Sequence, residues 1–171
     1  MGQPSLAIYV NELIQSYGAA RLIRIGSCGS IQPEVKLRDL IIAMSASTDS
    51  AMNDARFGRM HFAPTASPSL FLKAVRSAEH RKLPIRIGQV LASDSFYPDD
   101  PDGWRLWADY GVLAIEMETA MLYTLAARHQ VDALSILTVS DSIPSGETTT
   151  AEERRSTFTK MVDLALSLVE P

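Results

Sequence analysis

Residues 133–141 read Ala-Leu-Ser-Ile-Leu-Thr-Val-Ser-Asp, an almost unbroken apolar run that ends in a hydroxyl and a carboxylate. Such a run is typical of a strand that is covered on both faces of a sheet. In open α/β sheets, ligands bind beyond the carboxyl ends of the strands. The stretch therefore predicts a buried strand with a candidate polar pair, Ser140 and Asp141, at its end. An Asp in this place can instead cap a following turn, and this stretch alone does not decide between the two.

Strand and helix patterns alternate along the rest of the chain. Short apolar stretches predict further strands at residues 22–26, 39–44, 85–92 and 112–115. Apolar residues at helical spacing predict helices at residues 5–17, 69–82, 104–110 and 117–129. Thr149 with Glu152, and Thr150 with Glu153, form a double capping-box signature that opens a last helix. The alternation predicts an α/β fold with helices on both faces of the sheet.

Composition narrows the class of protein. The chain has 171 residues, of which 46% are hydrophobic and 21% charged, and this predicts a single domain over residues 1–171. The net charge is −4 and no basic run is visible, which argues against nucleic-acid binding. No stretch has the roughly 18 apolar residues of a membrane span, and no secretory leader pattern opens the sequence. We therefore expect a cytoplasmic protein with no membrane partner.

The single cysteine and the three histidines carry no recognisable chemistry. One cysteine, Cys28, excludes an internal disulfide. No histidine or acid lies near it in sequence, so we expect a buried thiol and not a nucleophile. The histidines are far apart in sequence, and no Cys/His cluster has the spacing of metal ligands. We therefore expect no metal.

Two further segments place polar groups beside predicted strands. Residues 24–30 (RIGSCGS) predict a strand that ends in a Gly-rich turn, whose arginine and hydroxyl donors suit an oxyanion such as phosphate. A tight turn without a ligand explains the same residues equally well. Residues 115–120 (IEMETA) place Glu116 and Glu118 at a strand-to-helix junction, where their spacing keeps them off one helical face. We expect the two acids to do different jobs, although a carboxylate that only meets the helix dipole is the alternative.

Taken together, the three segments suit one reaction. They predict an anion cradle, an acid for binding hydroxyls and an acid for proton transfer at one edge of the sheet. This set of groups suits the transfer of a glycosyl group to phosphate.

These segments resemble the hexameric, bacterial-type purine nucleoside phosphorylases. The resemblance runs from Met1 to the C-terminal helix and rests on IRIGSCGS (23–30), VKLRDLIIAMSASTDS (35–50), IEMETA (115–120), TVSD (138–141) and TTAEERRSTF (149–158). It implies a three-layer phosphorylase/hydrolase-like α/β fold with a central mixed sheet flanked by helices. It further implies phosphorolysis of purine (deoxy)ribonucleosides to the free base and (deoxy)ribose 1-phosphate. Inorganic phosphate would be the co-substrate, with no cofactor, in a homo-oligomer that is a hexamer built as a trimer of dimers.

The resemblance also implies roles for particular residues, carried over position by position. They are Arg24 and Ser27 for phosphate; Met1, Met117 and Glu118 for the ribose; Phe96, Ile115 and Ser140 for the base; and Asp141 and Arg154 for catalysis. Asp141 would protonate N7 of the leaving purine, a general-acid role. Burial favours the protonated acid, and Arg154, approaching when the site closes, would push the proton toward the purine.

The sequence departs from the family at its beginning. Before the position of Met1, family members carry the first strands, a phosphate-binding glycine and a second phosphate arginine. They also carry there a histidine and an arginine that reach the neighbouring subunit's site. We therefore expect an N-terminally shortened chain whose first strands are missing.

Two other functions remain open on the sequence. One is a nucleosidase, which would use water in place of phosphate, although Arg24 and Ser27 favour phosphate. The other is a non-catalytic binding or assembly subunit. A uridine-specific phosphorylase is disfavoured, because an aspartate suits purine N7 and no Gln/Arg pair that would recognise a pyrimidine is visible.

Overall fold

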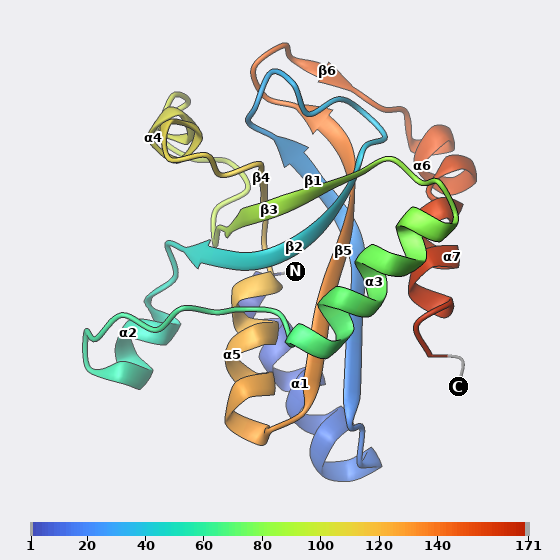
Figure 1. Cartoon of the computed structure of the whole chain (residues 1–171). Coiled ribbons are helices and arrows are strands. Elements are labelled where there is room, and N and C mark those ends of the chain that lie inside the picture. Colours follow the sequence, from blue (N-terminus) through green and yellow to red (C-terminus); the bar gives the residue numbers. More distant parts are fainter. Residues whose placement is uncertain (1, 170–171) are drawn as a thin grey trace.

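The chain alternates between helices and strands, as the sequence predicts. The computed structural model describes residues 2–169, with only the backbone described at residues 155–157. Its elements are α1 (Gly2–Tyr17), β1 (Arg21–Ser30), β2 (Leu40–Thr48), α2 (Ala51–Phe57), α3 (Pro68–His80), β3 (Ile85–Ala92), α4 (Trp104–Asp109), β4 (Ala114–Glu116), α5 (Thr119–His129), β5 (Asp132–Ser142), β6 (Glu147–Thr148), α6 (Ala151–Thr157) and α7 (Thr159–Leu166). Figure 1 shows their arrangement.

The strands form one mixed sheet that curls until it closes on itself. Along the sheet the strands pair in the order β4, β3, β2, β5 and β1, and β6 adds a short edge beside β5. β1 runs parallel to β5 along its whole length, whereas β2 runs antiparallel to β5. At its far end β1 also pairs antiparallel with β4, through Gly29 and Ser30, and this contact closes the curl. The central mixed sheet is confirmed, and the closure is a feature that the sequence did not predict.

Helices cover the sheet on two sides (Figure 1). α1 and α5 lie together on one side of the long strands β1 and β5, and α3 and α7 lie on the other. Successive side chains of β5 point to opposite faces of the sheet, and a different pair of helices lies over each face. Ser135 accepts a hydrogen bond from Thr119 on α5, whereas Thr138 contacts Met161 on α7. The run that predicted a buried strand is therefore buried from both faces, as expected of an apolar strand in the middle of an α/β domain.

Three local predictions were wrong or incomplete. The Gly-rich segment after Arg24 is not a turn, because β1 stays extended through Ser30 and pairs with β5. α2 was not predicted, although the hydroxyl of Ser50 caps its start and Gly58 ends it with a left-handed φ of 59°. The last helix is two helices, since Phe158 separates α6 from α7.

The predicted capping boxes have different outcomes. Thr150 and Glu153 make both reciprocal hydrogen bonds of a capping box at the start of α6. Thr149 instead donates its hydroxyl to the carbonyl of Ser140 at 2.9 Å. This bond fixes the start of α6 beside the end of β5, and only the second predicted box is formed.

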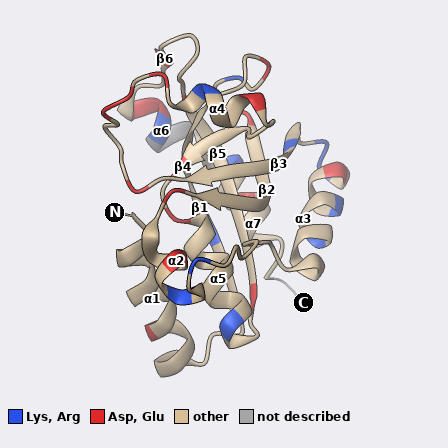
Figure 2. Ribbon diagram, turned by 90° about the vertical axis from the view of Figure 1, so that its left-hand side faces the viewer, with Lys and Arg blue, Asp and Glu red and all other residues tan. Residues whose placement is uncertain are grey.

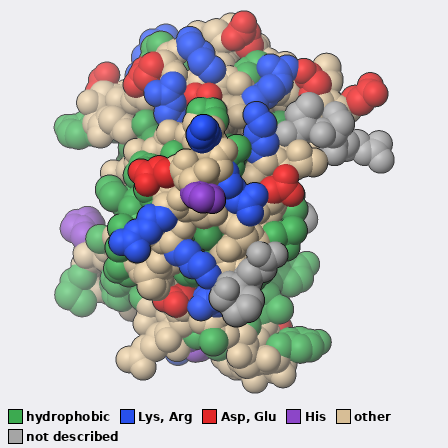
Figure 3. Space-filling model, turned by 45° about the vertical axis from the view of Figure 1, so that its right-hand side comes forward, with side chains coloured by type: hydrophobic (Ala, Val, Ile, Leu, Met, Phe, Trp, Pro, Cys, Tyr) green, Lys and Arg blue, Asp and Glu red, His purple; other side chains and the backbone are tan. Residues whose placement is uncertain are grey.

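The charges are unevenly distributed although the net charge is small. Figure 2 shows several Lys and Arg positions along α3, and Figure 3 shows Lys and Arg side chains gathered on one face of the molecule. α3 and the turn after it contribute Lys73, Arg76, Arg81 and Lys82, all exposed. These residues lie outside the cavity described below. Among the helices of residues 2–169, none has the length and apolar character needed to cross a membrane.

A buried tyrosine ties one helix layer to two strands. The hydroxyl of Tyr123, on α5, donates to the carbonyl of Ala43 at 2.6 Å and accepts from the backbone N–H of Ser135 at 2.9 Å. Ala43 and Ser135 are the last paired residues of the β2–β5 ladder. Tyr123 is 1% exposed, so water cannot replace either hydrogen bond.

We predict that Tyr123→Phe lowers the free energy of unfolding by about 1–3 kcal/mol, because a buried N–H and a buried C=O both lose their partner. Chemical denaturation measures the change. Tyr110→Phe is the matched control, since Tyr110 is 81% exposed, and it should change little. Equal stability of the Tyr123→Phe protein and the control would show that the bridge contributes nothing.

Candidate active site

A cavity of about 500 Å³ opens where β1, the β4–α5 junction and the end of β5 come together. Eight of the ten residues predicted for the site line it: Arg24, Ser27, Phe96, Ile115, Met117, Glu118, Ser140 and Asp141. The cavity also contains Glu116, Cys28 and Ile143. The predicted phosphate, ribose and base groups therefore share one hollow. Arg154 lies outside it, and Met1 lies outside the described residues.

The direction of β4 explains why these residues meet. Because β4 is antiparallel to β1, the chain that leaves β4 runs back along β1, from the Gly29–Ile115 pair toward Arg24. β5 is parallel to β1 and places Asp141 opposite Gly29. The site thus forms along a strand as well as at strand ends, and Ser27 lies inside β1, not in the predicted exit turn.

Arg24 is the centre of a charged cluster. Its Nη2 contacts Glu118 Oε2 and lies 3.2 Å from Glu116 Oε2. Its Nη1 is buried and has no hydrogen-bond partner. The guanidinium rests over Gly26, where an added Cβ would lie 2.7 Å from Nη1. A glycine is required at this place because any side chain would displace the guanidinium.

Glu116 is a functional candidate to which the sequence assigned no role. Its carboxylate is almost fully buried and accepts hydrogen bonds from the backbone N–H groups of Glu118 and Thr119, all at 3.0 Å. Burial raises the pKa of Glu116, and Arg24 and these N–H groups oppose the rise. Glu116 and Glu118 both contact Arg24, but their other hydrogen-bond partners differ. Only the fold shows that Glu116 caps α5 and faces Arg24.

The pair at the end of β5 forms a local hydrogen bond. The hydroxyl of Ser140 lies 2.6 Å from Asp141 Oδ2 and donates to it. Arg154 does not contact Asp141 here, and its Nη1 donates instead to the carbonyl of Thr149 at 2.7 Å. Arg154 lines a neighbouring shallow hollow, and Ser27 lines both hollows. The predicted Asp141–Arg154 pair remains a prediction for a closed state.

Cys28 belongs to the lining of the cavity but is almost fully buried. It is 4% exposed, and its thiol lies 3.7 Å from the carbonyl of Thr138. Burial, chiefly, and the charge of Glu116 raise the pKa of the thiol. A thiol that resists ionisation is a poor nucleophile, in agreement with the expectation from sequence.

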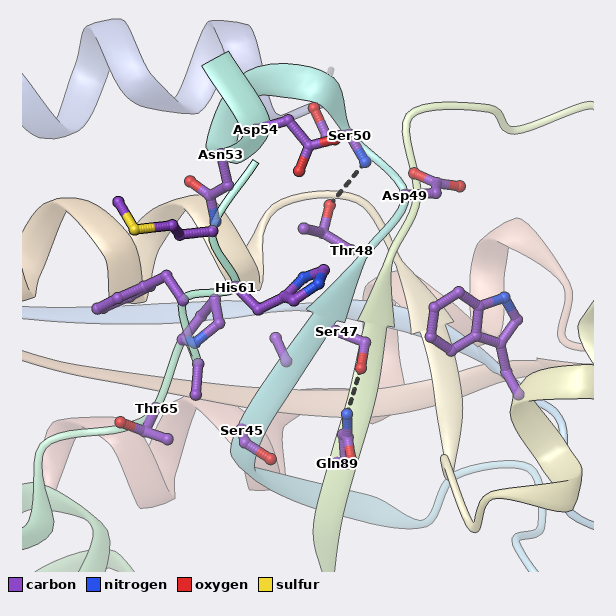
Figure 4. A pocket seen from close by; sticks show the side chains of 16 residues that line it. Ser45, Ser47, Thr48, Asp49, Ser50, Asn53, Asp54, His61, Thr65 and Gln89 are labelled. Atoms are coloured by element: carbon purple, nitrogen blue, oxygen red, sulfur yellow. Dashed lines mark hydrogen bonds between the residues drawn. The ribbon is translucent and has the colours of Figure 1, made fainter. Parts of the chain in front are cut away.

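A second hollow, of about 540 Å³, lies beside the end of β2 (Figure 4). Its polar groups largely serve the fold. Asp49 accepts from the hydroxyl of Ser93 at 2.6 Å and from the backbone N–H of Asp94 at 2.9 Å. Thr48 accepts from the backbone N–H of Ser50. Asp49 thereby holds the turn that leads to Phe96, a residue that lines the first cavity.

Comparison with known proteins gives a consistent result. The family model for the phosphorylase superfamily matches residues 1–171. Curated relatives named purine nucleoside phosphorylase DeoD-type include that of Thermoanaerobacter sp. (strain X514), which is 61% identical over 99% of this chain and 73% of its own length. The Caldanaerobacter subterraneus subsp. tengcongensis relative is 61% identical over 98% of this chain and 72% of its own length. The relative from Alkaliphilus metalliredigens (strain QYMF) is 57% identical over 99% of this chain and 73% of its own length.

We predict that Cys28 reacts with 5,5′-dithiobis(2-nitrobenzoic acid) at least about 100-fold more slowly in the folded chain than in guanidinium, because burial covers the thiol and disfavours the thiolate. Absorbance at alkaline pH follows the reaction. Release of one equivalent of thionitrobenzoate from the folded chain within seconds would contradict this assignment.

Proposed function

Because this chain belongs to the phosphorylase superfamily, and within it to the DeoD-type purine nucleoside phosphorylases, we propose that it cleaves purine (deoxy)ribonucleosides with inorganic phosphate. The products are the free purine and (deoxy)ribose 1-phosphate. The observation that best supports this reaction is the single cavity, in which a cation, a carboxylate and a second acid lie together.

Arg24 and Ser27 are the proposed phosphate ligands. Arg24 carries a buried N–H donor without an acceptor, and a buried donor of this kind costs about 1–3 kcal/mol until it is satisfied. Guanidinium groups bind phosphate oxygens through charge-assisted hydrogen bonds, and the exposed hydroxyl of Ser27 adds a donor. These groups favour phosphate over water as the attacking group, and hence a phosphorylase over a nucleosidase.

Glu118 and Asp141 are proposed for the nucleoside. A carboxylate accepts hydrogen bonds from the ribose hydroxyls, and Met117 packs beside the sugar. During the reaction, the C1′–N9 bond breaks with its electron pair going to the purine. A phosphate oxygen then bonds to C1′, and Asp141 supplies the proton that N7 takes up. Phe96, Ile115 and Ser140 surround the base in this arrangement.

A homo-oligomer, a hexamer as in the family, and a cytoplasmic role in purine salvage complete the proposal. Exposed apolar side chains on α1, Ile8, Tyr9 and Tyr17, support association of the chain with other copies. The direct test of the function is the release of base from inosine or adenosine, which should require phosphate. Release at the same rate without phosphate would favour the nucleosidase, and no release would favour a non-catalytic subunit.

We predict that Asp141→Asn lowers kcat/KM by about 10²–10⁴, or roughly 3–5 kcal/mol of transition-state stabilisation, because an amide cannot supply the proton. Steady-state kinetics with inosine and adenosine measure the loss. Asp109→Asn, an exposed substitution on α4, is the control and should leave activity unchanged. Near-normal turnover by the Asp141→Asn protein would refute the general-acid assignment.

We predict that Gly26→Ala raises the KM for phosphate by about tenfold, the cost of one misplaced charge-assisted hydrogen bond. The new methyl group would displace the Arg24 guanidinium, whose flexible end can move without disturbing the strand. The strand itself is undisturbed, so the variant should still fold, and a circular dichroism spectrum like that of the unmodified chain checks this. Gly103→Ala, beside α4, is the control and should leave the KM for phosphate unchanged. An unchanged KM for phosphate in the Gly26→Ala protein would show that Arg24 does not bind phosphate.

A further inference from the structure

Two side chains proposed to bind different substrates contact each other in the cavity. Arg24, proposed for phosphate, makes an ion pair with Glu118, proposed for the ribose hydroxyls. Both side chains are only 14% exposed, so little water screens the pair. Since phosphate must accept from this guanidinium and ribose must donate to this carboxylate, the ion pair competes with both substrates.

Glu116 holds its position independently of the ion pair. Its side chain is 1% exposed, and hydrogen bonds to the start of α5 keep it in place. It lies 3.2 Å from the same Arg24 nitrogen that contacts Glu118. When Arg24 and Glu118 separate, Glu116 therefore remains as the carboxylate that keeps Arg24 at the cavity.

Glu118 also remains in place when the pair opens. Its second carboxylate oxygen accepts from the backbone N–H of Gly2 at 2.8 Å. Its own backbone N–H is held by Glu116. The ion pair therefore opens by a shift of the Arg24 guanidinium and not of Glu118. The Nη1 of that guanidinium is buried without a hydrogen-bond partner, so it can still donate to an acceptor such as a phosphate oxygen.

We propose that the Arg24–Glu118 ion pair couples the binding of phosphate to the binding of the nucleoside, with Glu116 as the positioning residue that keeps Arg24 at the cavity while the pair is open. The inference rests on the proposed function and goes beyond it. Whichever substrate binds first breaks the ion pair. The side chain that binds the second substrate, Arg24 or Glu118, is then already released from its ionic partner. Each substrate therefore lowers the Kd of the other by the same factor, as thermodynamic linkage requires.

The coupling is measured with the full chain by isothermal titration calorimetry. Inorganic phosphate is titrated alone and at saturation with a purine C-nucleoside, in which a carbon–carbon bond replaces the cleavable bond. We expect the Kd for phosphate to fall about fivefold or more with the C-nucleoside present, and the reciprocal titration to give the same factor. An active enzyme whose Kd for phosphate is the same in both titrations would overturn the inference but not the proposed function.

Two isosteric variants separate coupling from structural damage. In Glu118→Gln, phosphate no longer breaks an ion pair, so it should bind alone about threefold or more tighter than to the unmodified chain. In Glu116→Gln, Glu118 becomes the only carboxylate on Arg24, so the coupling factor should rise above that of the unmodified chain. A purely structural role would weaken binding in both variants and leave the coupling factor unchanged.

Glu79→Gln, on the exposed face of α3, is the control and should keep both affinities and the coupling factor. Phosphate that binds Glu118→Gln no more tightly than the unmodified chain, or a coupling factor that does not rise in Glu116→Gln, would contradict the inference. Base release that never depends on phosphate would instead reject the proposed function, so the two failures are distinguishable.

Discussion

The candidate site depends on the buried carboxylate of Glu116. Glu116 ends β4 at 4% exposure, and a charge in such a place is tolerated only when donors surround it. Two backbone N–H groups at the start of α5 and the guanidinium of Arg24 provide them. Because these donors come from α5 and β1, the carboxylate fixes β1, β4 and α5 relative to one another. The positions of Arg24 and Glu118 both follow from this constraint.

The closure of the sheet serves the same constraint. β1 reaches β4 only because its last residues, Gly29 and Ser30, pair with β4 while the strand still pairs with β5. The register between β1 and β5 shifts at Cys28 and Gly29, at the level of the cavity. Gly26 then leaves room for the Arg24 guanidinium to lie across the strand toward Glu116 and Glu118. Without the closure, β4 and the arginine would not meet.

The sequence predicted those elements in which local and tertiary signals agree. The apolar run of β5 gives a strand buried from both faces, and Thr150 with Glu153 gives the start of α6. α2 was missed because its seven residues are too few to display an apolar stripe, although Ser50 and Gly58 cap it. The Gly-rich segment of β1 was misassigned because glycine usually marks a turn, whereas pairing with β5 and β4 holds it extended.

The site was predictable to a different degree. Local patterns singled out Ser140 with Asp141, the segment with Arg24, and the segment with Glu118, and the resemblance added their specific roles and the remaining lining residues; these side chains share one cavity. The role of Glu116 could not be predicted, since it depends on β4 running antiparallel to β1, a long-range choice that no local pattern records. A single acid before a helix looks the same whether it caps the helix, binds a ligand or does neither.

Arg154 and Asp141, which the proposed reaction brings together, do not contact each other in the structure. The proposed reaction has Asp141 give a proton to the leaving purine, with Arg154 approaching as the site closes. Arg154 instead donates to the carbonyl of Thr149, whose hydroxyl is bonded to Ser140, the neighbour of Asp141. The start of α6, which carries Arg154, is therefore anchored next to Asp141. In the proposed reaction, the exposed Arg154 side chain would approach Asp141 while β5 and the hydrogen bonds that hold the start of α6 stay in place.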